Sequence, residues 1–333
     1  SSPGTLVLAA RAIILATGSR PGSLPGIEPD GERVLSSDQV LQMPDLPRSL
    51  AVIGGGVIGC EFASLFADLG VDVTVIEALP GLLALTGLDD DVAKELGRVF
   101  RKRRVKMHFD SKVEALERGA RDVTIRLSGG KTVTAERALL SIGRRLNTGG
   151  LGLEEAGLRP GARGEISVDE NGETAVRGVY AIGDITGQAQ LAHLAAHHGL
   201  RAVRHALGQS PPPLSAAAVP GVVFTRPPVA MVGLSEQAAK SQSIDVAVGQ
   251  VALRALGKAH VAGELDGLIK VIAERPSGRM VGVHMVGART DEMIGEAALA
   301  VRLGLTLGDL ADTIHPHPTM SEGLWEAVRA ALR

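Results

Sequence analysis

Continuous apolar runs that end at a glycine recur along the chain. "RAIILATG" over residues 11–18 and "RALLSIG" over 137–143 share Arg-Ala, an apolar run and a glycine turn. Such runs are typical of buried strands in a parallel sheet. The second run closes a segment that begins with "LAVIGGGVIGCEF" at Leu50, so we expect it to be the last strand of a nucleotide-binding unit. By analogy the first run closes a similar unit, and we expect the chain to start inside a domain whose first half is missing or on another polypeptide.

Proline-rich stretches divide the rest of the chain. Pro44 and Pro47 mark one linker, and "GQSPPPLS" over 208–215, stiffened by three prolines, marks another. Alternating strand and helix patterns between the linkers predict an α/β fold. The expected elements are strands at 50–53 and 71–77, a helix to 69, a hairpin at 129–130, the stretch 178–187 and a helix at 190–206; then strands at 221–224, 245–251, 267–274 and 279–287, with helices near 291–303, 307–313 and 319–331.

Composition narrows the function classes. The 333 residues are 45% hydrophobic and carry a formal net charge of -2, enough for a large core in two or three domains. The one basic run, 101–104, is typical of a solvated helix end, so nucleic acid is not an expected partner. No apolar run reaches about 18 residues and no targeting pattern opens the sequence, so we expect no membrane span and a cytoplasmic location. The single Cys60 excludes an internal disulfide and a cysteine metal cage.

A glycine motif in the second unit indicates a dinucleotide site. Gly54, Gly56 and Gly59 form G-x-G-x-x-G between a predicted strand and a predicted helix, and Glu77 ends the next strand. The glycines would let the backbone approach a pyrophosphate at the helix N-terminus. Glu77 would bind a ribose 2'-hydroxyl and repel a 2'-phosphate, which favours NAD over NADP. A glycine-rich turn without a ligand is the alternative.

Three further features have both a structural and a functional interpretation. Asp184 ends an apolar strand, where an open sheet binds ligands, or it caps the following helix. His193 and His197 lie one turn apart with His198 beside them, but no carboxylate or cysteine completes a metal site, so a solvated helix face is preferred and no metal is expected. Cys60 opens a helix, where its thiol pKa could be lowered, although a packing role is favoured.

The stretch "HPHPTMSE" over 315–322 places two histidines and a glutamate before the last predicted helix. Thr319 and Glu322 have the spacing of a capping box, which would make Glu322 a helix cap. Each proline favours an extended conformation in the residue before it, so His315 and His317 would lie on a stiff approach to the helix. A neighbouring carboxylate would alternatively fix a histidine for acid–base chemistry.

An ordered set of motifs covers nearly the whole chain: "ILATGSRP", "IGGGVIGCEFA", "VTVIE", "IGRR", "YAIGDITG", "LAH", "VVFTRPPVAMVG", "GVHMVG" and "HPTMSE". It resembles the flavin-dependent pyridine nucleotide-disulfide oxidoreductases, and most closely the dihydrolipoamide dehydrogenases among them. The resemblance implies Rossmann-like FAD- and NAD(P)-binding domains plus a C-terminal α+β dimerisation domain. The expected boundaries are 1–45 for the end of the FAD-binding domain, 46–146 for the NAD-binding domain, 147–215 for a central region that completes the FAD site, and 216–333 for the interface domain.

The resemblance also implies two cofactors, FAD and NAD, and residues that bind each. For NAD it implies the run Gly54, Gly55, Gly56, Val57, Ile58, Gly59, Cys60 and Glu61, with Glu77 on the adenosine ribose and Val113 and Gly143 contacting through their backbone. For FAD it implies Thr17, Gly18, Ser19, Asp184 and the run Gln190, Leu191, Ala192 and His193.

In this family His317 would be the acid–base histidine and Glu322 the carboxylate that orients it, with a cis His317–Pro318 bond. His317 would serve the disulfide of the other subunit, which implies a homodimer built mainly by 216–333. His315 has no catalytic counterpart. Leu146, Pro228 and "HLAAHHG" depart from the family pattern without affecting the chemistry. The Cys-x4-Cys disulfide and the first FAD glycine motif are absent and expected upstream, so this chain alone would not perform disulfide exchange.

The expected function is oxidation of dihydrolipoamide, carried on a lipoyl-bearing complex component, with NAD+ as acceptor through FAD and a disulfide. The alternatives are another flavoprotein disulfide reductase, an NADH oxidase, or a non-catalytic NAD-binding dimerisation module. The ending "HPTMSE" argues against oxidases that lack this base.

Overall fold

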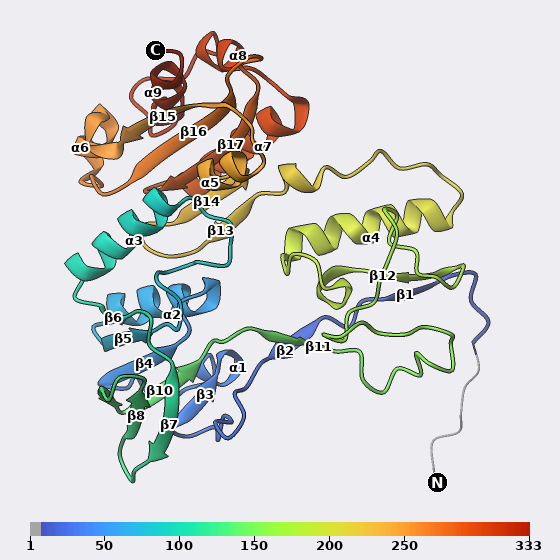
Figure 1. The fold of residues 1–333 in the computed structure, drawn as a ribbon, viewed down its shortest axis with the longest axis vertical. Helices are drawn as coiled ribbons and strands as arrows, with labels where there is room; N and C mark the ends of the chain where they lie inside the picture. Colours follow the sequence, from blue (N-terminus) through green and yellow to red (C-terminus); the bar gives the residue numbers. More distant parts are fainter. Residues whose placement is uncertain (1–7) are drawn as a thin grey trace. The chain divides into compact units, whose positions relative to one another are not determined.

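The dinucleotide-binding part of the chain is built on a five-stranded parallel sheet. The fold is a computed structural model that describes residues 8–333. The strands lie in the order β3-β10-β4-β5-β6, and α2 packs on β4 and β5 (Figure 1). A three-stranded antiparallel sheet, β7-β8-β9, belongs to the same part. The bounds are β3 Val34–Ser36, α1 Ser37–Val40, β4 Ser49–Ile53, α2 Val57–Asp68, β5 Asp72–Ile76, α3 Asp90–Lys102, β6 Lys106–His108, β7 Val113–Arg118, β8 Val123–Leu127, β9 Thr132–Ala135 and β10 Arg137–Leu140.

The C-terminal part is an antiparallel sheet in the order β13-β14-β17-β16-β15. Its amphipathic helices bury apolar faces against it: α9 packs on β15 and β16, and α7 on β14 and β17. The layered α+β arrangement follows from strands with continuous apolar runs next to helices with apolar stripes. The bounds are β13 Gly221–Val223, β14 Val229–Gly233, α5 Glu236–Ser241, β15 Val246–Ala252, α6 Gly257–Ala262, β16 Leu268–Glu274, β17 Met280–Val286, α7 Thr290–Leu303, α8 Leu307–Ala311 and α9 Glu322–Ala331.

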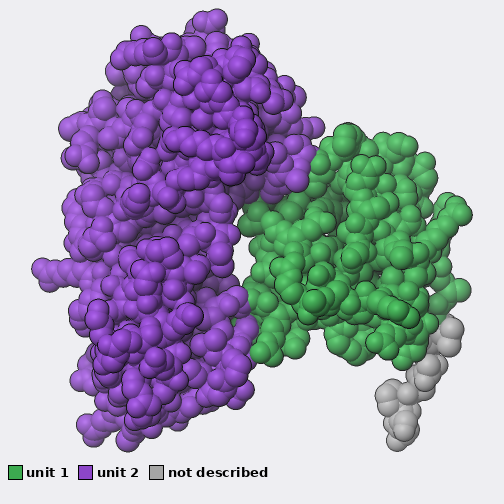
Figure 2. Space-filling view, in the orientation of Figure 1, with its two compact units in different colours: residues 1–21, 144–214 green, residues 22–143, 215–333 purple. Residues whose placement is uncertain are grey.

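The remaining segments form a smaller unit. Two parallel strands, β1 and β12, pair with each other, and β2 pairs antiparallel with β11. The chain therefore has two compact units, one of residues up to 21 with 144–214 and one of 22–143 with 215–333 (Figure 2). The bounds are β1 Ile13–Leu15, β2 Ser19–Pro21, β11 Arg144–Leu146, β12 Val179–Ala181, the 3-10 turn η1 Gly183–Thr186 and α4 Ala192–Ala206.

Within the larger unit, a buried ion cluster joins the dinucleotide-binding part to the C-terminal sheet. The Lys270 ammonium, whose side chain is 1% exposed, contacts the carboxylates of Asp89, Asp91 and Glu236 at 2.8, 2.9 and 2.7 Å. The Asp89 N–H donates to Nδ1 of His284, which lies opposite Lys270 on the neighbouring strand. Burial lowers the pKa of His284 to about 4. Separating the buried ammonium from these carboxylates would leave an uncompensated buried charge. The cluster therefore fixes the start of α3 on β16.

The strand and helix predictions for this fold are largely confirmed, with two corrections. The predicted burial of the first apolar run is wrong in part, because Ile13 and Ile14 of β1 are 52% and 36% exposed. Among the described residues β1 has β12 as its only strand partner, so little covers its side chains. The last helix begins at Glu322 rather than Thr319. Several elements were not anticipated from the sequence, among them strands β3, β6 and β14 and helices α1, α5 and α6.

Candidate functional site

The glycine motif forms a tight turn between β4 and α2. Gly54 has a φ of +110°, and its N–H donates to the carbonyl of Ile76 at 2.8 Å. A Cβ on Gly59 would lie 1.9 Å from the Gly54 carbonyl oxygen, so only glycine permits the first turn of the helix to pack on the strand end. A Cβ on Gly56 would have nothing within 4 Å. Gly59 is thus required by the fold, whereas Gly56 leaves open space at the helix N-terminus.

Glu77 holds the end of the neighbouring strand against this turn. One carboxylate oxygen accepts the N–H of Gly55 at 2.5 Å, and the other accepts the N–H of Leu79 at 2.8 Å. The two bonds fix the orientation of the carboxylate beside the helix N-terminus. This is the geometry that a ribose-binding acid needs, because a carboxylate oxygen keeps further lone pairs for a hydroxyl donor.

A cavity of about 540 Å³ opens beside Glu77, and we call it the dinucleotide cavity. Its size and its position at the carboxyl ends of parallel strands fit part of a dinucleotide. Five of the predicted NAD residues line it, namely Gly54, Gly56, Glu77, Val113 and Gly143. The sequence did not indicate the remaining lining residues, which include Leu24, Leu79, Ala84, Leu85, Thr86, Ser111, Lys112 and Ser141.

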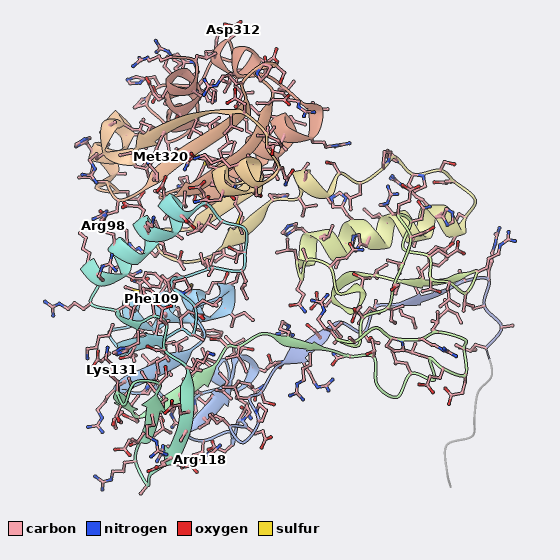
Figure 3. The ribbon with its side chains drawn as sticks, viewed as in Figure 1. Arg98, Phe109, Arg118, Lys131, Asp312 and Met320 are labelled. Atoms are coloured by element: carbon pink, nitrogen blue, oxygen red, sulfur yellow. The ribbon has the colours of Figure 1, made fainter. Side chains whose placement is uncertain are left out.

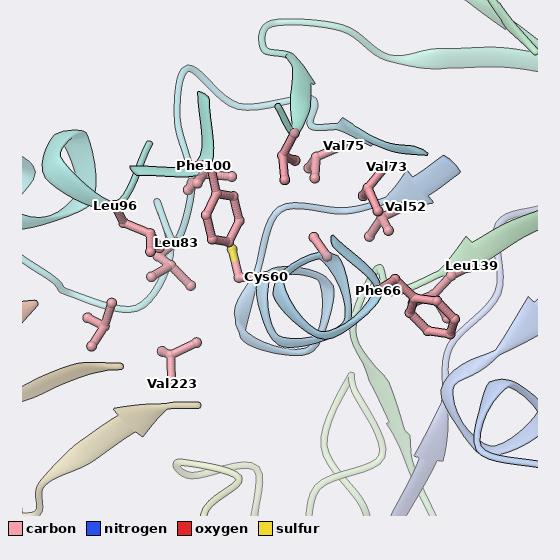
Figure 4. Close-up of a cluster of buried hydrophobic side chains, with 14 of the residues drawn as sticks. Val52, Cys60, Phe66, Val73, Val75, Leu83, Leu96, Phe100, Leu139 and Val223 are labelled. Carbon is pink, nitrogen blue, oxygen red and sulfur yellow. The ribbon is translucent and has the colours of Figure 1, made fainter. Parts of the chain in front are cut away.

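The other predicted NAD residues lie outside this lining. The Glu61 carboxylate accepts the N–H of Phe224 at 2.9 Å, and burial raises the pKa of Glu61. Cys60 is buried in the apolar cluster around α2 with Val52, Val75 and Phe100 (Figure 4). Burial raises the pKa of its thiol, with Glu77 and Glu61 adding to the effect, so the structure favours packing over a reactive thiol.

In the smaller unit, three predicted residues, Thr17, Ser19 and Asp184, lie where β1 and β12 end. Ser19 Oγ donates to the carboxylate of Asp184, and the Arg144 guanidinium donates to Ser19 Oγ at 2.6 Å. Thr17 Oγ1 donates to the carbonyl of Asn147 at 2.7 Å. Asp184 sits in the short helix η1 and has no helix-capping bond, so the capping alternative is not seen. Arg144 and Asn147 are contacts that the sequence did not indicate.

The segment 190–193 leads into α4 within the same unit. No side chain caps the first turn of this helix, whose N-cap residue is Leu191. An uncapped N-terminus presents backbone N–H donors and partial positive charge, which suits an anionic group. The hydroxyl and carboxylate groups near β1 and β12, with this N-terminus, fit the polar contacts that a flavin cofactor requires.

The segment 312–321, between α8 and α9, carries His317, and Glu322 follows it as the first residue of α9; we call this segment the histidine loop. Asp312 and Met320 at its ends are labelled in Figure 3. His317 Nδ1 lies 2.8 Å from Glu322 Oε1, and the His317 side chain is 78% exposed. Since a carboxylate only accepts, Nδ1 carries the hydrogen, and in the neutral ring the lone pair is on Nε2. No hydrogen bond engages Nε2 among residues 8–333, so it is open to solvent.

Glu322 is oriented by the loop itself. The Thr319 N–H donates to Glu322 Oε2 at 2.8 Å, and this bond followed by that of His317 lowers the pKa of Glu322. The predicted capping box is only half formed, because Thr319 Oγ1 donates to the carbonyl of Pro316 instead of accepting the Glu322 N–H. The predicted cis His317–Pro318 bond is confirmed.

The described residues show neither a candidate metal cluster nor a helix suited to cross a membrane. No group of three or more His, Cys, Asp or Glu side chains within residues 8–333 is arranged to hold a metal ion. Over the same residues, no helix combines the length and apolar character that a membrane crossing needs.

Two segments of the chain match models of the same protein family. Residues 3–199 match the family described as pyridine nucleotide-disulphide oxidoreductase, and 219–328 match the dimerisation domain of that family. These two matches include the dinucleotide cavity and the histidine loop.

Individual proteins and solved structures are also similar to this chain. The dihydrolipoyl dehydrogenase of Bacillus subtilis (strain 168) is 43% identical over 330 residues, covering 98% of this chain and 69% of that protein. The corresponding protein of Chlamydia pneumoniae is 40% identical over 318 residues, covering 96% and 68%. LpdA from Mycobacterium tuberculosis superposes with a TM-score of 0.89 at 34% identity, covering 96% of this chain and 69% of that one. The HOCl-induced flavoprotein disulfide reductase RclA from Escherichia coli gives 0.87 at 29%, covering 96% and 73%.

Proposed function

Because the chain belongs to the pyridine nucleotide-disulphide oxidoreductase family, we propose that it acts in the oxidation of dihydrolipoamide by NAD+. The balanced reaction converts dihydrolipoamide and NAD+ to lipoamide, NADH and a proton. FAD and NAD are the cofactors of this family, and bound FAD supplies the electron relay between the thiols and the nicotinamide. The sequence has one cysteine, and it is buried, so the proposed reaction requires a disulfide that these 333 residues do not supply.

The observation that carries the proposal is the His317–Glu322 pair. A thiol must lose its proton before it attacks a disulfide, and an imidazole accepts such a proton near neutral pH. Glu322 holds Nδ1–H, so the lone pair of Nε2 takes the thiol proton while the carboxylate stabilises the imidazolium that forms. The high exposure of His317 leaves this nitrogen accessible to a substrate or to another subunit.

The dinucleotide cavity provides the second part of the proposal. The turn at Gly54–Gly56 and the N-terminus of α2 would bind the pyrophosphate, and Glu77 the adenosine ribose. A fixed carboxylate at that position opposes a 2'-phosphate, so we propose NAD rather than NADP as the substrate. The contacts of Ser19, Asp184 and the start of α4 would hold FAD.

The matched dimerisation domain implies a homodimer. We propose that residues 216–333 build most of its interface and that His317 of one subunit serves the disulfide of the other. Obligate interfaces of this kind are large and apolar. Sedimentation of the purified protein at micromolar concentration should show a dimer, and a monodisperse monomer would contradict the proposal.

The substrate assignment is tested with the FAD-loaded enzyme, by which we mean the protein complete with the reacting disulfide. We expect NAD+ reduction with free dihydrolipoamide, and faster reduction when the dihydrolipoyl group is attached to a lipoyl domain, the proposed carrier. A parallel series measures NADH consumption with other disulfides and with oxygen. Turnover with another disulfide or with oxygen that exceeds the dihydrolipoamide rate would replace the proposal by the reductase or oxidase alternative.

A further inference from the structure

A second histidine of the histidine loop, His315, pairs with a carboxylate on α7, and the proposed reaction does not use this pair. His315 Nε2 lies 3.0 Å from Glu296 Oε1 on α7, and its Nδ1 lies 3.1 Å from the carbonyl oxygen of Thr313. The His315 side chain is 6% exposed, whereas that of His317, two residues later, is 78% exposed. Two imidazoles in one short loop therefore have opposite environments.

Both ring nitrogens of His315 face an acceptor. One is the backbone carbonyl of Thr313 in the loop, and the other is the carboxylate of Glu296 on α7. The ring is thus held at two points, one on its own loop and one on a helix of the packed C-terminal core.

The connection from this anchor to His317 is short and stiff. Pro316 has a fixed φ and favours an extended conformation at His315, and Pro318 does the same for His317. Thr319 Oγ1 donates a hydrogen bond to the carbonyl of Pro316 at 2.7 Å. The Thr319 N–H donates to the carboxylate of Glu322. A rotation of the His315 backbone would therefore move both members of the His317–Glu322 pair.

The start of the loop is fixed separately. Trp325 Nε1 on α9 donates to the carbonyl of Ala311 at 2.9 Å, and the Arg329 guanidinium lies 4.4 Å from the Trp325 ring centre. The end of α8 is therefore held on α9 whether or not His315 is in place. The His315–Glu296 bond fixes the middle of the loop. The largely exposed His317 lies there and is not held by burial.

From this geometry we propose that His315 and Glu296 are positioning residues that hold His317 Nε2 in the orientation in which it accepts a proton. The inference rests on the proposed function, because it assigns these residues a role through His317. It makes His315 a residue whose contribution to turnover disappears when His317 is absent, which a residue that only stabilises the fold would not show.

The test is a mutant cycle on the FAD-loaded enzyme with dihydrolipoamide and NAD+. Glu296→Leu removes the acceptor, Glu296→Gln keeps an acceptor without the charge, and Glu292→Leu is the control one turn earlier on α7, where the side chain is exposed. We expect Glu296→Leu to lower kcat about tenfold with an unchanged KM for NAD+, because small misplacements of a reacting group are costly. Glu296→Gln should recover part of the loss, and Glu292→Leu should show none.

The same substitution is then made in the His317→Gln background. A positioning role predicts that Glu296→Leu has no further effect there, and an equal loss in both backgrounds would overturn it. The failure of the proposed function gives a different result, namely that His317→Gln alone leaves turnover unchanged. Sedimentation and thermal midpoints of all variants identify any loss of dimer or fold.

A second readout needs no turnover. In the purified chain at pH 7, Glu296→Leu should shift the ring nitrogen resonances of ¹⁵N-labelled His315, because the ring loses its contact with the carboxylate. The His317 resonances should then shift as well, because the loop has moved. His317 resonances that are unaffected by Glu296→Leu would contradict the proposal.

Discussion

The dinucleotide cavity and the histidine loop each depend on a glutamate that a backbone N–H holds, but the fold depends on them to different degrees. Glu77 receives two backbone bonds at the end of a buried parallel sheet, near Gly54 and Gly59, which leave no space for a side chain. Glu322 receives one and shares its other oxygen with a largely exposed histidine. Substitution of Gly59 should therefore damage folding and binding together, whereas substitutions in the loop should separate activity from stability.

The largest effect is expected for Gly59→Ala. The new methyl group would lie 1.9 Å from the Gly54 carbonyl, so β4 and α2 must separate, at a cost of about 3 kcal/mol or more. Denaturant unfolding and NAD titration should both show the loss. Gly56→Ala is the matched control: its methyl group meets no atom of the protein, so stability should be nearly unchanged while NAD binds more weakly. Equal stability of the two variants would contradict the packing argument.

The next effect is the pH dependence of stability. The folded-state pKa of His284 is lowered from 6.5 to about 4, so the unfolded chain binds a proton first as the pH falls. The contribution is complete above pH 6.5 and lost between there and about pH 4, amounting to roughly 3 kcal/mol. His284→Leu should remove this part of the pH dependence of the unfolding free energy, and His317→Gln in the exposed loop should leave it intact. A pH-independent wild-type stability over this range would refute the assignment.

The preference for NAD over NADP tests the role of Glu77 in the dinucleotide cavity. Glu77→Gln should weaken NAD binding about tenfold and reduce the discrimination against NADP, because a neutral amide no longer repels the 2'-phosphate. Titration of the purified chain with both dinucleotides measures this, and the exposed Glu28→Gln serves as the control. Equal or tighter binding of NADP by the unmodified protein would contradict the role of Glu77.

A smaller effect is expected for Glu322→Gln. The amide oxygen can still accept the Thr319 N–H, but the imidazolium loses its charged partner, so turnover should fall about tenfold with little change in thermal midpoint. Glu326→Gln, one turn later on α9, provides the comparison. If Glu322→Gln instead lowers the midpoint by many degrees with normal turnover per folded protein, the carboxylate is a structural residue.

The sequence indicated the central residues of both regions, and local patterns made this possible. Glycine spacing and an acid at a strand end report a local backbone geometry, so Gly54, Gly56 and Glu77 could be identified from residues close together in the chain. Thr86 and Ser141 also line the cavity, but they come from segments that meet only in the folded protein. No local sequence pattern indicates that they lie there.

Pairings over long sequence distances escaped prediction in the same way. Glu296 lies on α7, nineteen residues before His315, and its helical pattern did not distinguish it from other exposed acids. The ion pairs of Lys270 were not predicted either, because Lys270 lies in a strand whose other residues are mostly apolar. The two similar runs at β1 and β10 also differ in burial, because burial depends on neighbouring strands rather than on the run itself.

The two regions correspond to two half-reactions, and measuring both in one variant tests the central claim. In the FAD-loaded His317→Gln enzyme, reduction by NADH should proceed at the normal rate, since the dinucleotide cavity is unchanged. Reduction by dihydrolipoamide should be slower by about 100-fold or more, the typical effect of losing a positioned base. Thermal midpoint and dimer content should match the unmodified enzyme. A near-normal rate of reduction by dihydrolipoamide would contradict the assignment of His317 as the base.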